Sequence, residues 1–410
     1  MSSSKQLVGA NRVVTGRGKI DEKAEPKTAL EGRRVIIVLT ELELGGAERQ
    51  AMLLAKFLAH EQKAHVEVWG FLGQPGRVAK LCEEYGIPWR ITPWPWSDKR
   101  SERLKRMAQF AWRLRRARPD ILLPYLIFPN VICGQVWRLT GARTCIWNQR
   151  DEGIGRMPRA ERRAASQVPL FISNSQAGAN FLTEKLGARR ERVRVVHNGV
   201  TLAPIKADRA EWRRELRLTD DSFAACMVAN LTQYKDHDTL LRAWRLVLDA
   251  MQREGRSAVL LLAGRLDSSD STHHPVKALA YDLDLGKSVR FLGQVLDLSG
   301  LLGAVEIGVF SSRSEGSPNG VLECMAAGLA VAGTDIIGIS EAVGPSGEAY
   351  LAPPGDAESL ADRILKLAAD PGLRARLGAA NRLRIETEFS PEHMCEQVLA
   401  LMLEGLQGKS

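Results

Sequence analysis

The arrangement of apolar segments constrains the fold of this chain more than any other feature. From about Arg34 to Leu406, short apolar segments alternate with amphipathic segments of helix length. Strands separated by helices run parallel in a sheet, and the helices cover the faces of that sheet. The alternation is interrupted at residues 197–207, where Asn198-Gly199 and Pro204 are typical of a linker, and then starts again. The chain is therefore expected to form two α/β domains.

The expected elements divide evenly between the two halves. In the first half, the expected strands are 35–40, 66–71, 89–92, 121–125, 145–148, 170–173 and 193–197, and the expected helices are 47–59, 77–85, 102–116 and 177–186. In the second half, the expected strands are 224–229, 259–263, 289–292, 307–310, 330–332 and 349–351, and the expected helices are 239–251, 276–283, 319–327, 357–369, 373–386 and 391–406. The pattern predicts two Rossmann-like, doubly wound parallel-sheet domains, residues 34–200 and 201–390, facing each other across a cleft. Ligands of such sheets bind at the carboxyl ends of the strands, where helices begin.

The composition is consistent with a protein of two domains that has no membrane-spanning helix. Of the 410 residues, 45% are hydrophobic and 26% are charged, which is enough to fill two cores. No apolar run reaches the roughly 18–20 residues that a membrane span requires. Residues 1–33 are polar and lack periodicity, so we expect a disordered tail without a secretory segment. The six cysteines are scattered, as expected for reduced thiols in a cytoplasmic protein.

The net charge of +9 is unevenly distributed. Basic residues crowd one expected helix of the first half: Lys99, Arg100, Arg103, Lys105, Arg106, Arg113, Arg115, Arg116 and Arg118. They form either a solvated helix face or a surface for anionic lipid headgroups on the inner face of the plasma membrane. Nucleic acid is not an expected partner, because these residues are not interleaved with exposed aromatic residues and no recognition module is present.

Two glycines follow the first expected strand. Gly45 and Gly46 would let the backbone approach a phosphate or sugar, and the helix after them presents unpaired amide groups. A tight turn would explain the two glycines equally well. The GxGxxG fingerprint of dinucleotide-binding domains is absent, which argues against a dehydrogenase.

The segment from Ser311 to Glu323 carries the most specific pattern. Ser317 suits the N-cap position of a helix and Pro318 the first helical position, so the amide groups of residues 319–321 can bind a pyrophosphate. Glu315 precedes this helix and Glu323 lies in its second turn, and carboxylates bind the paired hydroxyl groups of a sugar or ribose. A capped surface helix with two solvated acids is the alternative, which the apolar residues around Glu323 disfavour.

Two cations and a loop occur at other strand ends. Lys235 and Arg265 each follow a strand, where either could neutralise a leaving diphosphate or form a salt bridge with a nearby acid. Gly293 ends a further strand, in a loop that could offer backbone groups to a nucleobase.

These motifs resemble those of the GT4 family of retaining glycosyltransferases. The most specific is the E-x7-E motif from Glu315 to Glu323, and the similar segments are Gly45-Gly46-Ala47-Glu48, His197-Asn198-Gly199-Val200, Lys235, Val289-Arg290-Phe291-Leu292-Gly293 and Met325-Ala326-Ala327-Gly328. The resemblance implies a GT-B fold, with an acceptor-side first domain and a donor-binding second domain. It also implies that the last helix, 391–408, crosses back onto the first domain.

The resemblance also implies roles for single residues. Gly45 and Gly46 would lie against the donor phosphates or the acceptor, Lys235 would bind the diphosphate, Glu315 would hold hydroxyls of the transferred sugar, and Glu323 would hold the ribose. The other expected donor-binding residues are Arg265, Gly293, Ser317, Asn319, Gly320, Val321 and Leu322. The expected catalytic residues are Glu315, Lys235 and Tyr125.

The sequence departs from the family pattern at two places. Asn230 occupies the approximate position where many relatives carry an arginine, which makes Arg265 the candidate for a second cation. Many relatives carry a histidine at the end of the fourth strand, where Tyr125 or Asn130 is the candidate replacement on the acceptor side. Arg150, after the next strand, is either an acceptor-side cation or a partner of Asp151.

The implied reaction transfers a sugar from a nucleoside-diphosphate sugar, with UDP-sugars favoured, to a hydroxyl acceptor with retained configuration. The basic first domain suggests a lipid-linked or polysaccharide glycan of the cell envelope as acceptor. No metal or other cofactor is expected, because no carboxylate pair follows a strand and Asp267 and Asp270 lie in a flexible stretch. The alternatives are a sugar-nucleotide epimerase of the same architecture and an inactive sugar-nucleotide-binding subunit.

Overall fold

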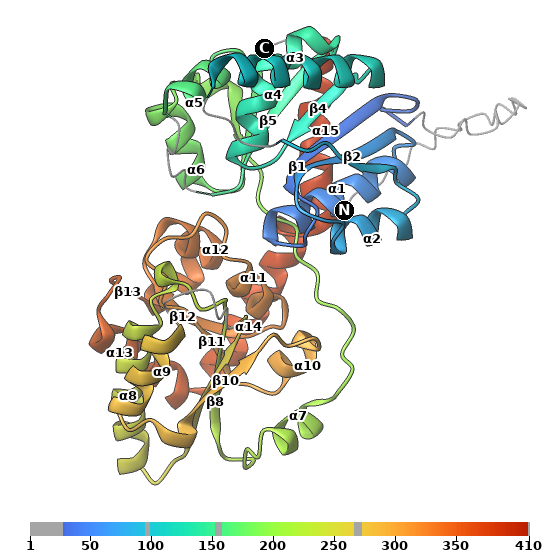
Figure 1. The fold of residues 1–410 in the computed structure, drawn as a ribbon. Coiled ribbons are helices and arrows are strands. Elements are labelled where there is room, and N and C mark those ends of the chain that lie inside the picture. The colour runs from blue at the N-terminus through green and yellow to red at the C-terminus, as the bar shows by residue number, and fades with distance from the viewer. Residues whose placement is uncertain (1–27, 95–98, 152–157, 266–272, 409–410) are drawn as a thin grey trace, which may run out of the picture.

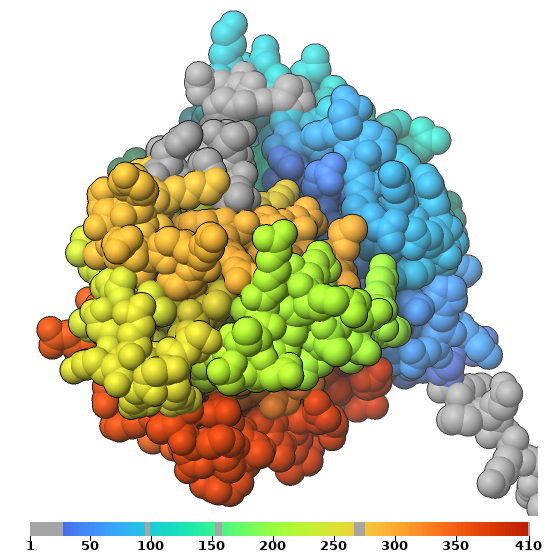
Figure 2. All heavy atoms as spheres, turned by 90° about the horizontal axis from the view of Figure 1, so that it is seen from below, coloured from blue at the N-terminus to red at the C-terminus, as the bar shows by residue number. Residues whose placement is uncertain are grey.

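The structure contains the two expected α/β domains, stacked one on the other (Figure 1). The computed structural model describes residues 28–94, 99–151, 158–265 and 273–408. Figure 2 views the molecule along the stacking direction: the second domain, green to red, covers most of this face, and the first domain, in blue, is visible beside it.

Both sheets are parallel. The first has the strand order β3-β2-β1-β4-β5-β6-β7 and the second the order β10-β9-β8-β11-β12-β13. The strands of the first sheet are β1 Arg34–Glu41, β2 His65–Leu72, β3 Trp89–Ile91, β4 Ile121–Pro124, β5 Thr144–Gln149, β6 Leu170–Ser173 and β7 Val193–Val195. Those of the second are β8 Phe223–Val228, β9 Ala258–Ala263, β10 Val289–Gly293, β11 Ile307–Val309, β12 Ala330–Thr334 and β13 Leu351–Ala352.

The order of each sheet reverses at one place, between β1 and β4 in the first domain and between β8 and β11 in the second. Connections leave such a pair of strands in opposite directions, which opens a crevice at their carboxyl ends. The Gly45-Gly46 corner follows β1, Lys235 follows β8 and Glu315 follows β11. The topology therefore places the predicted motifs at the switch points of the two sheets.

The helices cover both faces of the sheets. Those of the first half are α1 Gly46–His60, α2 Arg77–Glu84, α3 Arg100–Ala117, α4 Ile127–Thr140, α5 Pro158–Ala165 and α6 Gln176–Asn180, which continues as a π-helical turn, η1 Phe181–Lys185. Those of the second half are α7 Arg209–Glu215, α8 His237–Arg253, α9 His273–Asp282, α10 Leu298–Gly303, α11 Asn319–Ala326, α12 Ile337–Gly347, α13 Ala357–Ala369, α14 Pro371–Glu388 and α15 Pro391–Gln407.

The last helix, α15, packs on the first domain although it follows the second in the chain. It contacts α1, β5 and β6, and Met394, Val398 and Met402 join the core beside β1. In Figure 1 this red helix lies among the blue and green elements of the first domain. The two chain crossings between the domains touch, because the Val200 amide donates to the carbonyl of Phe389 (2.8 Å).

The folded part of the chain begins before residue 34, where the predicted disordered tail was expected to end. Residues 1–27 lie outside the described part of the chain, but Leu30 is fully buried in the core of the first domain. The backbone amide of Gly32 donates a hydrogen bond to the Lys63 carbonyl, and the amide of Arg33 donates one to the Leu30 carbonyl. The prediction of disorder up to residue 33 is therefore wrong for residues 28–33, where a single apolar side chain anchors a polar segment.

Candidate functional site

Lys235 and Glu315 form an ion pair between the two strand ends at the switch point of the second sheet. Lys235 ends a short 3-10 turn, η3 Gln233–Lys235, after β8, and Glu315 lies in the loop after β11. Glu315 also accepts a hydrogen bond from the hydroxyl of Ser312 (2.7 Å), and both ion-pair side chains are largely buried. The pair sets a carboxylate and an ammonium group side by side in front of α11.

Helix α11 begins at Asn319, the first residue of the expected helix 319–327, but its N-cap differs from the expected one. Its N-cap is Pro318, without a side-chain cap, and Asn319 is its first residue, so the N-cap role expected of Ser317 is wrong. The Asn319 amide donates instead to the Ser317 carbonyl (3.0 Å). The next two amides, of Gly320 and Val321, have no acceptor within the helix, since the first turn of any α-helix leaves its amides without intrahelical partners. These two amides lie at the N-terminal end of α11, where the helix dipole makes the electrostatic potential positive.

Glu323 connects α11 to the first domain. It is buried, and its carboxylate Oε1 lies 3.2 Å from the guanidinium Nη1 of Arg49, in the first turn of α1. Burial raises the pKa of Glu323, and the positive charges of Arg49 and Lys235 partly offset this. The two glutamates of the E-x7-E motif thus each contact one cation, Lys235 from the second domain and Arg49 from the first.

The starts of α1 and α11 face each other across the domain boundary. A β-carbon added to Gly46 would lie 2.7 Å from the side-chain nitrogen of Asn319, so a larger residue at position 46 would displace that side chain. Asn319 in turn accepts a hydrogen bond from the side chain of Asn198 in the linker (3.0 Å). Two helix ends of positive dipole potential therefore meet at one place.

The ends of β8, β9 and β10 lie next to these groups. The side chain of Asn230 accepts a hydrogen bond from the backbone amide of Arg265 (2.9 Å), and the Arg265 side chain is exposed. Gly293 has a left-handed φ of 67°, and its carbonyl accepts from the Gly264 amide (2.9 Å). Asn230 therefore joins the ends of β8 and β9.

The structure does not place Tyr125 and Asn130 on an accessible surface. Tyr125 is fully buried in the core of the first domain. Asn130 is also fully buried, and its side chain bonds both the amide and the carbonyl of Asn148 in β5 (3.1 and 2.8 Å). Both side chains are thus buried in this conformation, and their expected role in contacting substrate stays a prediction.

Arg150 lies directly over Tyr125. Its guanidinium carbon is 4.8 Å from the centre of the Tyr125 ring, and it donates to the side-chain oxygens of Asn148 (3.3 Å) and Asn198 (3.2 Å). The residue is buried, which lowers the pKa of its guanidinium. Arg150 thus ties the end of β5 to the linker, and it is not an exposed acceptor-side cation.

Two family models match the chain in succession. The model of Glycosyltransferase Family 4 matches residues 44–203, and the model of glycosyl transferases group 1 matches residues 208–384. The chain belongs to the GT4 family. This family comprises retaining glycosyltransferases.

The GT4 chain has similar curated proteins. The D-inositol 3-phosphate glycosyltransferase of Actinosynnema mirum is 28% identical over 247 residues, which are 58% of this chain and 58% of that protein. The GDP-mannose-dependent monoacylated alpha-(1-6)-phosphatidylinositol monomannoside mannosyltransferase of Corynebacterium glutamicum is 28% identical over 204 residues, 48% of this chain and 51% of that protein. The chain thus spans about half the length of the curated relatives it matches.

Solved structures of glycosyltransferases share the GT-B fold of this GT4 chain. The Anabaena HepE structure in complex with UDP has a TM-score of 0.76 and 19% identity, covering 90% of this chain and 98% of that one. A glycosyltransferase of Rickettsia africae has a TM-score of 0.79 and 18% identity, covering 92% and 100%. The GT-B architecture expected from the sequence is therefore confirmed.

Three contact residues of the GT4 site were not predicted from the sequence: Arg49, Ser312 and Asn198. Arg49 lies one helical turn after the Gly45-Gly46 corner, and this position in the sequence could have identified it as a candidate site residue. Within the described residues, no group of three or more His, Cys, Asp and Glu side chains could hold a metal ion. Asp267 and Asp270 lie outside the described residues.

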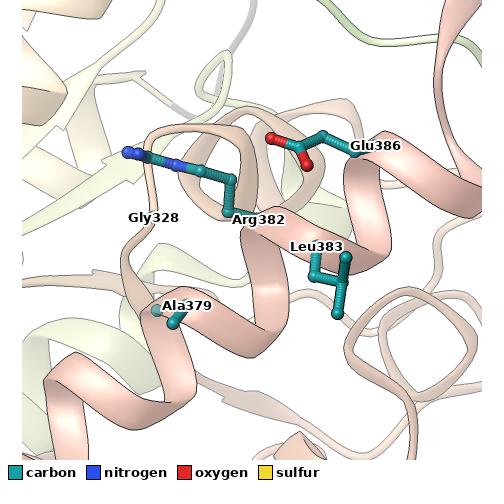
Figure 3. Close-up of a pocket in the computed structure, with 6 residues that line it drawn as sticks. Gly328, Ala379, Arg382, Leu383 and Glu386 are labelled. Carbon is teal, nitrogen blue, oxygen red and sulfur yellow. The ribbon is translucent and has the colours of Figure 1, made fainter.

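A surface hollow of about 350 Å³ lies at the opposite end of α11 (Figure 3). It is lined by Gly328, Gly378, Ala379, Arg382, Leu383 and Glu386. Figure 3 shows the Arg382 side chain extending toward the Gly328 turn, and its guanidinium donates to the Ala327 carbonyl (3.2 Å). Its lining residues come from α14 and the C-terminal turn of α11, so this hollow is separate from the site at the strand ends.

Proposed function

We propose that this GT4 protein is a retaining glycosyltransferase that moves a sugar from a nucleoside-diphosphate sugar to a hydroxyl acceptor. The observation that carries the proposal is the convergence of Glu315, Glu323 and Lys235 on the start of α11 at the domain boundary. Such an arrangement offers two carboxylates for hydroxyl groups and positive charge for a diphosphate between them.

Each group has a role in the proposed reaction. The diphosphate binds the amides of Gly320 and Val321 and the ammonium of Lys235, while Glu315 accepts hydrogen bonds from the transferred sugar and Glu323 from the ribose. As the donor bond breaks, negative charge grows on the diphosphate, where Lys235 and the α11 dipole stabilise it. The leaving phosphate takes the proton of the acceptor hydroxyl. A protein base is then not required, which agrees with the burial of Tyr125.

Replacement of Glu315 tests this proposal. We expect Glu315→Gln to reduce turnover about 100-fold or more, because it weakens the sugar contact and releases Lys235. Turnover is measured as nucleotide released from a panel of donors with an acceptor mixture, and Glu84→Gln, which removes an exposed surface acid paired with Arg77, is the matched control. Activity of Glu315→Gln equal to that of the control would remove Glu315 from the mechanism.

The same donor panel addresses the nucleotide, the metal and the product. We propose a UDP-sugar as donor and no metal requirement, so release should be unchanged by a chelator. An epimerised sugar in place of a glycoside would indicate an epimerase, and donor binding without turnover would indicate an inactive subunit.

We further propose that helix α3 contacts anionic lipid on the inner face of the plasma membrane and thereby brings the protein to a lipid-linked or polysaccharide acceptor. Trp112 and Leu104 are exposed on α3, so the expectation that no exposed aromatic residue lies among these basic residues is wrong. The Arg116 guanidinium carbon lies 4.8 Å from the centre of the Trp112 ring. A hollow of about 620 Å³ beside them is lined by Arg34, Trp112, Arg115, Arg116 and Arg118. An interfacial tryptophan among cations is typical of peripheral membrane surfaces.

Figure 1 places α3 at the end of the first domain that is far from the second domain, so membrane contact would leave the cleft uncovered. No helix among the described residues is long and apolar enough to cross a bilayer.

Charge reversal on α3 tests the membrane contact. We expect the triple change of Arg113, Arg115 and Arg116 to Glu to abolish flotation with liposomes that contain anionic lipid, because each basic residue near such a surface contributes about 1 kcal/mol. The matched control reverses Arg242, Arg253 and Arg376 of the second domain, with the same change in net charge. Equal flotation of the two variants would contradict the proposal.

A further inference from the structure

Positive electrostatic potential at the boundary between the domains comes from both domains, and not from the α11 motif alone. The starts of α1 and α11 approach each other at Gly46 and Asn319. Both helix ends carry positive dipole potential, so their approach is unfavourable unless negative charge lies near them. In the structure the buried carboxylate of Glu323 supplies negative charge there, within α11 itself.

Arg49 adds a full positive charge at the same place. It belongs to the first turn of α1, and its side chain is 57% exposed while that of Glu323 is 11% exposed. The arginine is thus the exposed partner of the pair and the carboxylate the buried one. Lys235 is paired with Glu315, in the loop that leads into α11. The two cations thus each contact one glutamate of the motif that carries the start of α11.

Asn230, which follows β8, supplies no charge at that strand end, because it is uncharged and its side chain accepts a hydrogen bond from the Arg265 backbone amide. A diphosphate carries more negative charge than Lys235 alone can neutralise, and a guanidinium binds phosphate oxygens bidentately. Arg49 is a cation of the first domain whose side chain contacts the α11 motif, at Glu323.

We propose that Arg49 is the second cation that binds the donor diphosphate, and that Glu323 holds it in place until the donor arrives. This inference rests on the proposed function. The ribose hydroxyls replace Arg49 at Glu323, and the released guanidinium turns to the diphosphate a few ångströms away. The first domain, otherwise the acceptor side, thereby contributes a donor-binding residue. Because Arg49 and Glu323 belong to different domains, the exchange couples donor binding to the contact between the domains.

The test is a calorimetric titration with UDP and GDP on the full chain. We expect Arg49→Met to weaken binding of the nucleoside diphosphate by about 10-fold to 100-fold, as for a lost hydrogen bond to a charged group. Arg49→Lys, which keeps the charge, should recover part of the affinity. Arg77→Met, which removes an exposed arginine paired with Glu84 on α2, is the matched control and should bind as the wild type does.

The same Arg49 substitution in a Glu323→Gln variant distinguishes a role of Arg49 in ligand binding from a role in supporting the structure. In Glu323→Gln, Arg49 has lost its carboxylate partner, so a purely structural Arg49 no longer matters there. We expect Arg49→Met to weaken binding about 10-fold in this background as well. Because Glu323 is then neutral, the double variant carries no unpaired buried charge, and thermal unfolding verifies its fold.

The outcomes distinguish the inference from the proposed function. If Lys235→Met loses binding while Arg49→Met binds as tightly as the wild type in both backgrounds, the inference is wrong and the proposed function stands. If the wild type binds no nucleoside diphosphate, the proposed function fails and the inference fails with it.

Discussion

Asn230 and Arg49 illustrate the residue scale of this site. The resemblance to the family implies that Asn230 occupies the approximate position of a cation in many relatives, and Arg265, in the same domain, was the candidate replacement. The structure shows the side chain of Arg265 exposed and Arg49 in contact with Glu323, 274 positions along the chain. No local pattern connects residues so far apart, so this contact could not be predicted from the sequence. Glu315, Glu323 and Lys235 could be selected as candidates, because each lies after a strand or in the helix that follows it, which is a local pattern.

His237 provides a prediction at the same scale. It is the first residue of α8, next to Lys235, and burial together with the Lys235 charge lowers its pKa from 6.5 to about 4. Below pH 6.5 the unfolded chain binds a proton that the folded protein does not bind until pH 4. His237 therefore contributes stability above pH 6.5 that is lost as the pH falls toward 4, amounting to about 3 kcal/mol.

Urea unfolding of the wild type and His237→Gln between pH 7 and pH 4 measures this contribution. The free energy of unfolding should fall more steeply in the wild type, since the variant has no proton to take up at this position. Parallel curves for the two proteins would show that His237 is not held neutral.

At the scale of elements, the amphipathic helices α1, α3, α8, α13 and α15 and the buried strands were predicted well, because their apolar pattern repeats several times. The helices α4, α5, α7, α10 and α12 were missed. Helix α12 contains Pro345 and a left-handed Gly344, which hide its periodicity. The strand expected at residues 349–351 begins as a 3-10 turn, Glu348–Tyr350, and β13 comprises Leu351–Ala352. At a sheet edge, few neighbours fix where such a strand starts.

The close packing of α11 against β8 gives a prediction at the scale of elements. A β-carbon on Gly320 would lie 2.0 Å from the Val228 carbonyl oxygen, so Gly320→Ala must push the helix away from the strand. We expect a loss of about 1–3 kcal/mol in the free energy of unfolding, as for overpacked cores, and weaker binding of nucleoside diphosphates. Gly303→Ala in α10, where an added β-carbon meets nothing within 4 Å, is the control and should be neutral in both assays. An unchanged Gly320→Ala would show that α11 is not held by this contact.

At the scale of the whole molecule, the contacts between the domains join distant parts of the chain. Arg49 bonds Glu323, Asn198 bonds Asn319, and the Gln176 amide donates to both carboxylate oxygens of Glu341 (3.0 and 3.1 Å). Two domains of this kind were predictable from the repeated pattern. Their contact surface was not, because it depends on three-dimensional placement.

The central claim is that a nucleoside diphosphate binds between the two domains at the start of α11. A crystal structure of the protein with UDP, or with GDP if only that nucleotide binds, tests this claim most directly. The account predicts phosphate oxygens within about 3.2 Å of the Gly320 and Val321 amides and of Lys235, with the ribose at Glu323. A nucleotide bound elsewhere, with the Lys235–Glu315 and Arg49–Glu323 pairs intact, would contradict it.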